Sequence, residues 1–228
     1  MSMEIDVLTL FPGMFKGFLD ESIIKRSQKK GLVKINLHDI RDFTTDKHKK
    51  VDDRPFGGGP GMVLMVDPIV RAFEYLYEKG KEDYHKIILT PAGSRLTQKK
   101  AQKMSKEKGL ILLCGHYEGF DQRIFDLIKF DANISVGKYV LSGGELPSMV
   151  VMDAVIRLIP GVLGNQLSSE MESFTKGTEF DHPQYTRPRN YKGHCVPDVL
   201  FSGNHAEIDR WRKMSTRLLP GKLANKNK

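Results

Sequence analysis

Short apolar runs that stop abruptly at glycine or proline, and that alternate with helical patterns, constrain this chain most strongly. Residues 110–114, Leu-Ile-Leu-Leu-Cys, end at Gly115, and residues 87–90, Ile-Ile-Leu-Thr, end at Pro91. Runs of this length and composition are typical of strands buried inside a sheet. Because helical patterns separate these strands along the chain, the sequence predicts an α/β fold with a parallel sheet.

The remaining elements are predicted from the same periodicities. We expect strands at residues 4–10 and 33–37, with a further apolar run at 132–136. Helical patterns cover residues 14–30, 67–79, 97–108, 122–129 and 146–159. Gly31 and Gly109 are expected to end the first and third of these helices, because glycine commonly follows a helix C-terminus. The segment 41–61 has no steady period, and we interpret it as an ordered functional loop.

Two glycine-containing loops follow closely in the sequence, GHYEG at residues 115–119 and LSGGELP at residues 141–147. Glycine lets a backbone approach a ligand closely and leaves its N–H groups unobstructed. The two loops therefore favour a pocket built mainly from main chain, although two ordinary tight turns would give the same pattern. The pocket is not of the Rossmann type, because no GxGxxG follows a strand, and there is no Walker motif.

Length and composition place the chain among soluble globular proteins. Its 228 residues suffice for one large domain, or for one plus a small domain. No apolar run is long enough to cross a membrane, and the N-terminus lacks the features of a secretion signal. Cys114 and Cys195 are far apart and have no partners at metal-ligand spacing. We therefore expect a cytoplasmic protein with no membrane segment and no metal site.

The positive charge of the chain indicates a polyanionic partner. The formal net charge is +8, and residues 182–197 and 210–228 carry cations but no acidic residue. In the first of these segments, tyrosines lie between the cations. Cations neutralise phosphates and aromatic rings stack on bases, so together the two segments favour an RNA partner.

The polar segment 164–177 has a glycine at each end and no apolar period, which is typical of a linker. We predict a domain at residues 1–163, this linker at 164–177, and a small mainly helical domain at 178–228. The small domain is expected to contain one clear helix at residues 205–218. A capping Ser202 or Asn204 is expected to start it.

Several long motifs resemble one family. They are GHYEG, SVGKYVLSGGELP and DAVIRLIPGVLG, with RDFTTDKHKKVDDRPFGGGPGMV before them and HPQYTRPRNYKGHCVPDVLFSGNH after them. The chain resembles the bacterial tRNA (guanine-37-N1)-methyltransferases, which belong to the knotted SPOUT class of S-adenosylmethionine-dependent RNA methyltransferases. The resemblance implies a deep C-terminal trefoil knot at about residues 87–160. It also implies a homodimer whose active sites lie at the subunit interface, and binding of the tRNA anticodon stem-loop.

The implied reaction requires a base and a cation. The guanine N1 carries a proton at neutral pH, so a general base must remove it while a cation balances the charge on O6. The resemblance places the base at Glu172, where the family has aspartate; Glu170, or no residue here, remains an alternative. It places the cation at Arg157, which could instead serve the helix C-terminus or pair with Asp153.

The resemblance also implies binding residues. His116 departs from the arginine frequent in the family, so we assign it no catalytic role, and magnesium is an expected activator without a dedicated site. RNA contacts are expected at Ser173, Arg187, Arg189, Lys192 and His205. S-adenosylmethionine is expected to contact Leu89, Thr90, Pro91, Gly115, Tyr117, Glu118, Ser135, Val136, Gly137, Tyr139, Val140, Leu141, Gly143 and Gly144.

Two alternatives stay open at this point. One is a methyltransferase of the same class acting on another RNA or on a ribose, and ribose methylation would not require Glu172. A basic RNA-binding module that has lost catalysis would explain the departures at Glu172 and His116, but the complete glycine loops argue against it.

Overall fold

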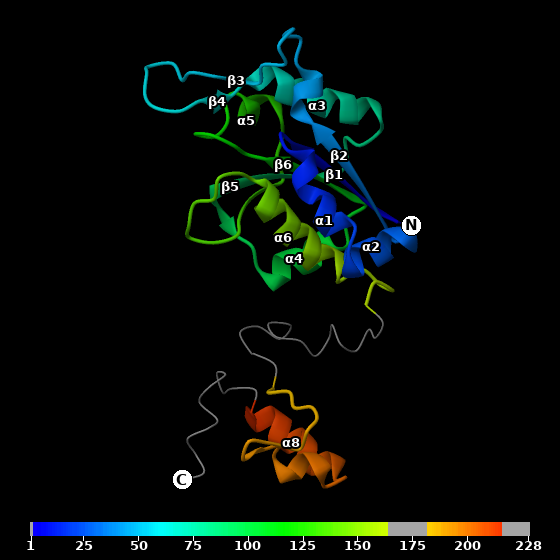
Figure 1. Ribbon diagram of the computed structural model, residues 1–228. Coiled ribbons are helices and arrows are strands. Elements are labelled where there is room, and N and C mark those ends of the chain that lie inside the picture. Colours follow the sequence, from blue (N-terminus) through cyan, green and yellow to red (C-terminus); the bar gives the residue numbers. More distant parts are fainter. Residues whose placement is uncertain (1, 164–181, 216–228) are drawn as a thin grey trace. The chain divides into compact units, whose positions relative to one another are not determined.

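The computed structural model describes residues 2–163 and 182–215 of the chain. The chain divides into two compact units, Met1–Gly164 and Asn165–Lys228 (Figure 1). The predicted linker, with Glu172 and Ser173, lies outside the described residues.

A five-stranded parallel sheet forms the centre of the first unit, as the alternation of strands and helices predicts. Its order is β2-β1-β6-β5-β7, and every pair is parallel. All residues of β6 are buried, which explains why its sequence is apolar throughout rather than alternating. The strands are β1 (Met3–Thr9), β2 (Val33–Asp39), β5 (His85–Arg95), β6 (Gly109–Cys114) and β7 (Ala132–Ser135).

Helices cover both faces of this sheet (Figure 1). One core cluster joins it to α1 (Lys16–Leu19), α2 (Ser22–Lys29), α4 (Gln98–Met104) and α6 (Glu145–Ile156). The other joins it to α3 (Val66–Glu78) and α5 (Ile124–Leu127). Two-residue strands β3 (Asp52–Asp53) and β4 (Val63–Leu64) pair antiparallel at either end of the glycine-rich loop, and short 3-10 helices occupy Pro12–Phe15 and Ile40–Phe43.

Two helix predictions were wrong in detail. The helix expected at residues 14–30 is broken into the 3-10 turn, α1 and α2, with Ser22 in the left-handed region (φ 51°) at the break. The break lets Phe15 and Ile24 both reach the core. The helix expected at 97–108 ends at Met104, and Gly109 begins β6 instead of capping it. A side chain at Gly109 would collide with the Tyr84 ring, which lies 2.3 Å from the position of a Cβ.

A cluster of charges joins the first two strands to the segment before β5. Asp6 is fully buried and accepts hydrogen bonds from Lys81 and Asn36, and its carboxylate lies 2.8 Å from His38 Nε2. Burial alone would raise the pKa of Glu4, but hydrogen bonds from Lys34, Tyr84 and Asn36 lower that pKa to about 2. The Glu4 carboxylate therefore stays ionised at neutral pH.

In the second unit, the described residues form a hairpin of β8 (Asn190–Tyr191) and β9 (His194–Cys195), a 3-10 turn (Asp198–Phe201) and α8 (His205–Ser215). Asn204 accepts a hydrogen bond from the backbone N–H of Glu207 through its side chain, so it caps α8 as the sequence predicts. Trp211 of α8 lies 6.1 Å from the ring of Tyr185.

Candidate active site

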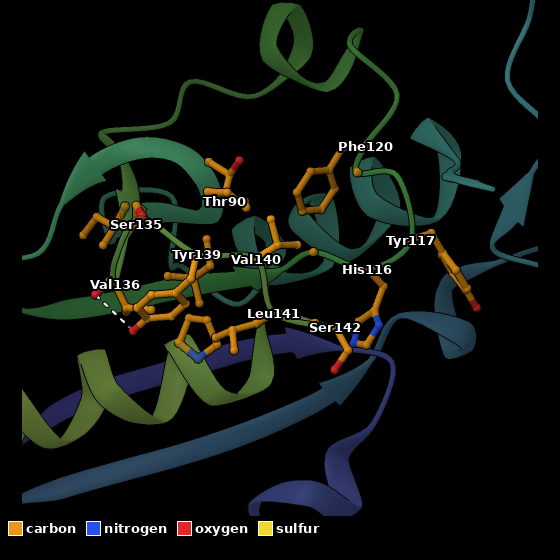
Figure 2. Close-up of a pocket in the computed structure, with 18 of the residues that line it drawn as sticks. Thr90, His116, Tyr117, Phe120, Ser135, Val136, Tyr139, Val140, Leu141 and Ser142 are labelled. Atoms are coloured by element: carbon orange, nitrogen blue, oxygen red, sulfur yellow. Dashed lines mark hydrogen bonds between the residues drawn. The ribbon is translucent and has the colours of Figure 1, made fainter. Parts of the chain in front are cut away.

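A pocket of about 290 Å³ opens beside the middle of β5 and the carboxyl ends of β6 and β7. Ligands of open parallel α/β sheets bind at this edge, because the loops that leave the strands there are free to vary. One wall comes from Leu89–Pro91 in β5, a second from the loop after β6, and a third from the loop between β7 and α6 (Figure 2).

Every residue predicted from the sequence to bind the cofactor lines this pocket. The structure thus brings together Leu89, Thr90, Pro91, Gly115, Tyr117, Glu118, Ser135, Val136, Gly137, Tyr139, Val140, Leu141, Gly143 and Gly144. His116, Gly119, Phe120, Ile134, Ser142 and Pro147 line it as well. In Figure 2 the ring of Tyr117 extends away from the other labelled side chains.

The two glycine loops are joined directly through their main chains. The Gly144 N–H donates to the Gly115 carbonyl at 2.7 Å, and His116 pairs with Gly143 in an antiparallel bridge. A Cβ on Gly144 would lie 2.6 Å from both Cys114 Cα and Gly115 N, closer than any real contact. The close approach of the two loops therefore requires glycine at position 144.

The third wall, the loop after β7, is held by hydrogen bonds within the loop. The Ser135 hydroxyl donates to the Gly137 carbonyl at 2.9 Å, and the Tyr139 hydroxyl donates to the Val136 carbonyl at 3.4 Å (Figure 2). The Tyr139 ring lies so close to Gly137 that a Cβ there would be 2.2 Å from it. Apolar side chains beside glycine-rich main chain suit a flat heteroaromatic ligand whose edge is bound by backbone donors and acceptors.

His116 is neither a free loop histidine nor exposed to solvent. Its Nε2 lies 2.6 Å from Oε2 of Glu145, whose side chain is only 1% exposed. The other carboxylate oxygen, Oε1, accepts the hydroxyl of Thr9. Sequence reasoning missed Thr9 and Glu145. An acidic residue in the first turn of a helix is common because it stabilises the helix N-terminus, so nothing in the sequence indicated that Glu145 has a further role.

The glycine-rich loop at residues 57–61 is attached to the pocket. The Glu118 N–H donates to the Met62 carbonyl at 2.9 Å, and Leu64 pairs with Phe120 in a parallel bridge. A Cβ on Gly61 would lie 2.4 Å from the Glu118 carboxylate. The positive φ of Gly61 (82°) favours glycine there.

The predicted catalytic arginine is not in this pocket. Arg157 follows α6 directly, whereas the pocket lies at the start of α6 around Gly144. With a rise of about 1.5 Å per residue, the helix separates the backbones of residues 145 and 157 by about 18 Å. The described chain therefore does not bring Arg157 to the cofactor residues of its own pocket.

The buried thiol of Cys114 borders the same region. Burial, followed by the charge of Glu145, raises the pKa of Cys114 well above its usual value. The thiol therefore stays protonated and is a poor nucleophile.

The predicted RNA contacts of the second unit are exposed. Arg189 donates to Asp198 at 2.9 Å and stacks over the Phe201 ring at 4.1 Å, so part of its role is to hold the 3-10 turn. Lys192 lies over the Tyr191 ring at 5.5 Å, and Arg187 and His205 are at the surface.

Among residues 2–163 and 182–215, no three His, Cys, Asp or Glu side chains gather in a way that would hold a metal ion. In the same part of the chain, no helix has both the length and the hydropathy of a membrane span.

The fold and the pocket define a parallel α/β protein with a pocket between main-chain loops that follow strands of its sheet. A solved structure of this kind is the tRNA (m1G37) methyltransferase of Aquifex aeolicus. It is 38% identical to this chain with a TM-score of 0.77, and the match covers 92% of this chain and 88% of the other.

The family model described as tRNA (guanine-1)-methyltransferase TrmD matches residues 3–222, and the chain belongs to this family. Relatives named tRNA (guanine-N(1)-)-methyltransferase agree with this. The one from Carboxydothermus hydrogenoformans is 51% identical over 95% of this chain and 83% of its own length. The one from Geobacillus kaustophilus is 53% identical over 92% and 85%.

Proposed function

We propose that this enzyme transfers a methyl group from S-adenosylmethionine to N1 of guanosine 37 in tRNA. Membership of the family is the main support for this reaction, and the pocket between the two glycine loops supports the binding of the cofactor. No observation favours a ribose substrate or an inactive binding module. Because tRNA is the substrate, the proposed location is the cytoplasm.

In this proposal the pocket residues bind and orient the cofactor. The main chain of Gly115, Gly143 and Gly144 approaches the ligand without side-chain obstruction, while Leu89, Val136 and Leu141 exclude water from its apolar part. When bound, S-adenosylmethionine supplies an activated methyl group on a sulfonium. The protein then has to position guanine N1 and remove its proton.

The proposed base is Glu172, and the proposed cation is Arg157. Glu172 accepts the N1 proton as the methyl group is transferred, and Arg157 balances the charge that moves to O6. Magnesium remains a proposed activator without a dedicated ligand set. Ser173, which follows the proposed general base Glu172 in the sequence, contacts the anticodon stem-loop. The cations Arg187, Arg189 and Lys192 and His205 at the start of α8 bind it as well.

We also propose a homodimer with the active site between two subunits. The distance of about 18 Å along α6 between the pocket and Arg157 is consistent with a site completed by the partner subunit. An apolar surface on the same helix supports the interface: Leu146 and Val150 are 50% and 48% exposed, and Met14 of the neighbouring 3-10 helix is 48% exposed. Contiguous exposed apolar residues of this kind mark interaction sites.

A Val150→Lys substitution is expected to weaken the dimer and to lower methyl transfer, because it places a charge in the apolar interface. Sedimentation or light scattering at several protein concentrations measures the mass. Leu127→Lys is the matched control, since Leu127 is exposed on α5, which covers the opposite face of the sheet. A parent chain that is monomeric, or a Val150→Lys variant that is as dimeric as the parent, would contradict the proposed interface.

The trefoil knot at residues 87–160 is part of the proposal. Two observations support it. The register between β5 and β7 shifts between Leu89 and Ser94, where Gly93 approaches the main chain of Asn133 and Ile134 so closely that a Cβ would lie 2.7 Å away. The segment 136–144 then returns against the end of β6. The proposed domain limits are 1–163, 164–177 and 178–228.

Labelled methyl transfer to two tRNA transcripts tests the function. The transcripts differ only at position 37, guanosine in one and adenosine in the other. Labelling of the guanosine transcript alone, mapped as N1-methylguanosine, is the expected result. Equal labelling of both transcripts would overturn the base assignment in favour of a ribose or another site. An absence of labelling despite bound cofactor would indicate an inactive module.

A further inference from the structure

We infer that Glu145 is a positioning residue of the cofactor pocket, which braces its walls through His116 and Thr9 without touching the ligand. The inference rests on the proposed function, because it concerns the same pocket. Thr9 and Glu145 do not line the pocket, whereas His116 does. The three residues, named here the Thr9–Glu145–His116 brace, link the end of β1, the start of α6 and the loop after β6.

The carboxylate of Glu145 is the centre of this brace. Its Oε1 accepts the Thr9 hydroxyl at 2.5 Å, and its Oε2 lies 2.6 Å from His116 Nε2. We assign the imidazole Nε2–H as the donor, because a carboxylate oxygen accepts hydrogen bonds. Thr9 is fully buried, and Glu145 is 1% exposed. Charge-assisted hydrogen bonds that are shielded from water in this way are strong and directional.

The brace acts on the two loops that bind the cofactor. The Glu145 carboxylate lies directly behind Gly143, where a Cβ would be 2.6 Å from Oε2 and 2.3 Å from the His116 ring. Through His116 the carboxylate holds the loop after β6, and as the first residue of α6 it holds the loop before that helix. Glu145 therefore connects the two walls, one through its side chain and the other through its backbone.

Thr9 connects the brace to a third segment. Its hydroxyl oxygen also accepts the backbone N–H of Phe11 at 3.0 Å, and the Phe11 ring packs edge-on against His116 at 4.9 Å. The Thr9 hydroxyl thus both donates and accepts a hydrogen bond. The His116 ring is held by Phe11 through ring packing and by Glu145 at Nε2. The orientation of His116 in the pocket wall is set by residues behind it.

Calorimetric binding of S-adenosylmethionine to the full chain tests the inference. We expect Glu145→Gln and His116→Phe each to raise the Kd by about tenfold or more, as the loss of a charge-assisted hydrogen bond implies. Thr9→Val keeps the shape but removes the hydroxyl, and is expected to raise the Kd by about fivefold. The Kd for tRNA is expected to stay within about twofold of the parent value in all three.

Conservative variants distinguish positioning from general stability. Thr9→Ser keeps the hydroxyl and His116→Gln keeps an N–H donor, so both are expected to restore binding to within about threefold of the parent. Ser27→Ala is the matched control. It removes a buried hydroxyl that donates to Ile24 on α2, and it should leave the Kd unchanged.

Several results would overturn the inference. It fails if Glu145→Gln and His116→Phe bind the cofactor as the parent does, or if Thr9→Ser binds no better than Thr9→Val. S-adenosylhomocysteine lacks the sulfonium charge. In each variant its Kd should rise by the same factor as the Kd for S-adenosylmethionine. Selective loss of the cationic ligand would make Glu145 an electrostatic group instead. Equal binding by parent and variants overturns this inference alone, whereas a parent that binds no cofactor also overturns the proposed function.

Discussion

Glu172→Gln is expected to lower kcat for methyl transfer to tRNA by about 10²–10⁴-fold, the range typical of general-base catalysis. Glutamine has nearly the same size as glutamate but cannot take the N1 proton. Cofactor and tRNA should therefore bind as before, and the loss should appear in kcat rather than in either Kd. Single-turnover transfer of labelled methyl groups at saturating cofactor measures it.

Two control variants accompany this substitution. Glu170→Gln tests the neighbouring acid of the same segment and should retain activity. Glu172→Asp restores the residue that the resemblance leads us to expect at this position, and should keep most of the rate. Methylation of a ribose would not require this base, so full activity of Glu172→Gln would remove Glu172 from the mechanism and reopen the ribose alternative.

Gly144→Ala is expected to abolish measurable cofactor binding. Its Cβ would lie 2.6 Å from Cys114 Cα and Gly115 N, and neither is a flexible side chain that could move aside. The start of α6 must therefore separate from the end of β6, which breaks the Gly144–Gly115 hydrogen bond and opens the pocket wall. Overpacking of this kind destabilises the fold by about 1–3 kcal/mol or more.

Gly17→Ala is the matched control for the glycine substitution. Gly17 lies in α1, no atom is within 4 Å of its Cβ position, and alanine favours a helix. The melting temperature and the Kd for S-adenosylmethionine are measured on both variants. A Gly144→Ala chain that binds cofactor within about threefold of the parent would show that the two loops need not approach so closely.

The sequence by itself predicted the strands of the central parallel sheet and many of the residues that line the pocket. The run at residues 110–114 is buried on both sides, so its apolar composition is enough to predict a central strand of a parallel sheet. Gly144 is required by a close approach of main chain, and the sequence shows this requirement as a glycine at that position. The family resemblance predicted the cofactor residues, and in the structure all of them line one pocket.

Tertiary structure alone decided which distant residues meet. Thr9 and Glu145 are 136 positions apart, and only the parallel sheet brings the end of β1 next to the start of α6. The break after α1 arises because apolar side chains on both sides of it pack on one core. Arg157 lies on the predicted helix, yet the rise of that helix carries it away from the pocket. Local patterns encode the burial of each segment, whereas packing between segments sets the distances on which the chemistry depends.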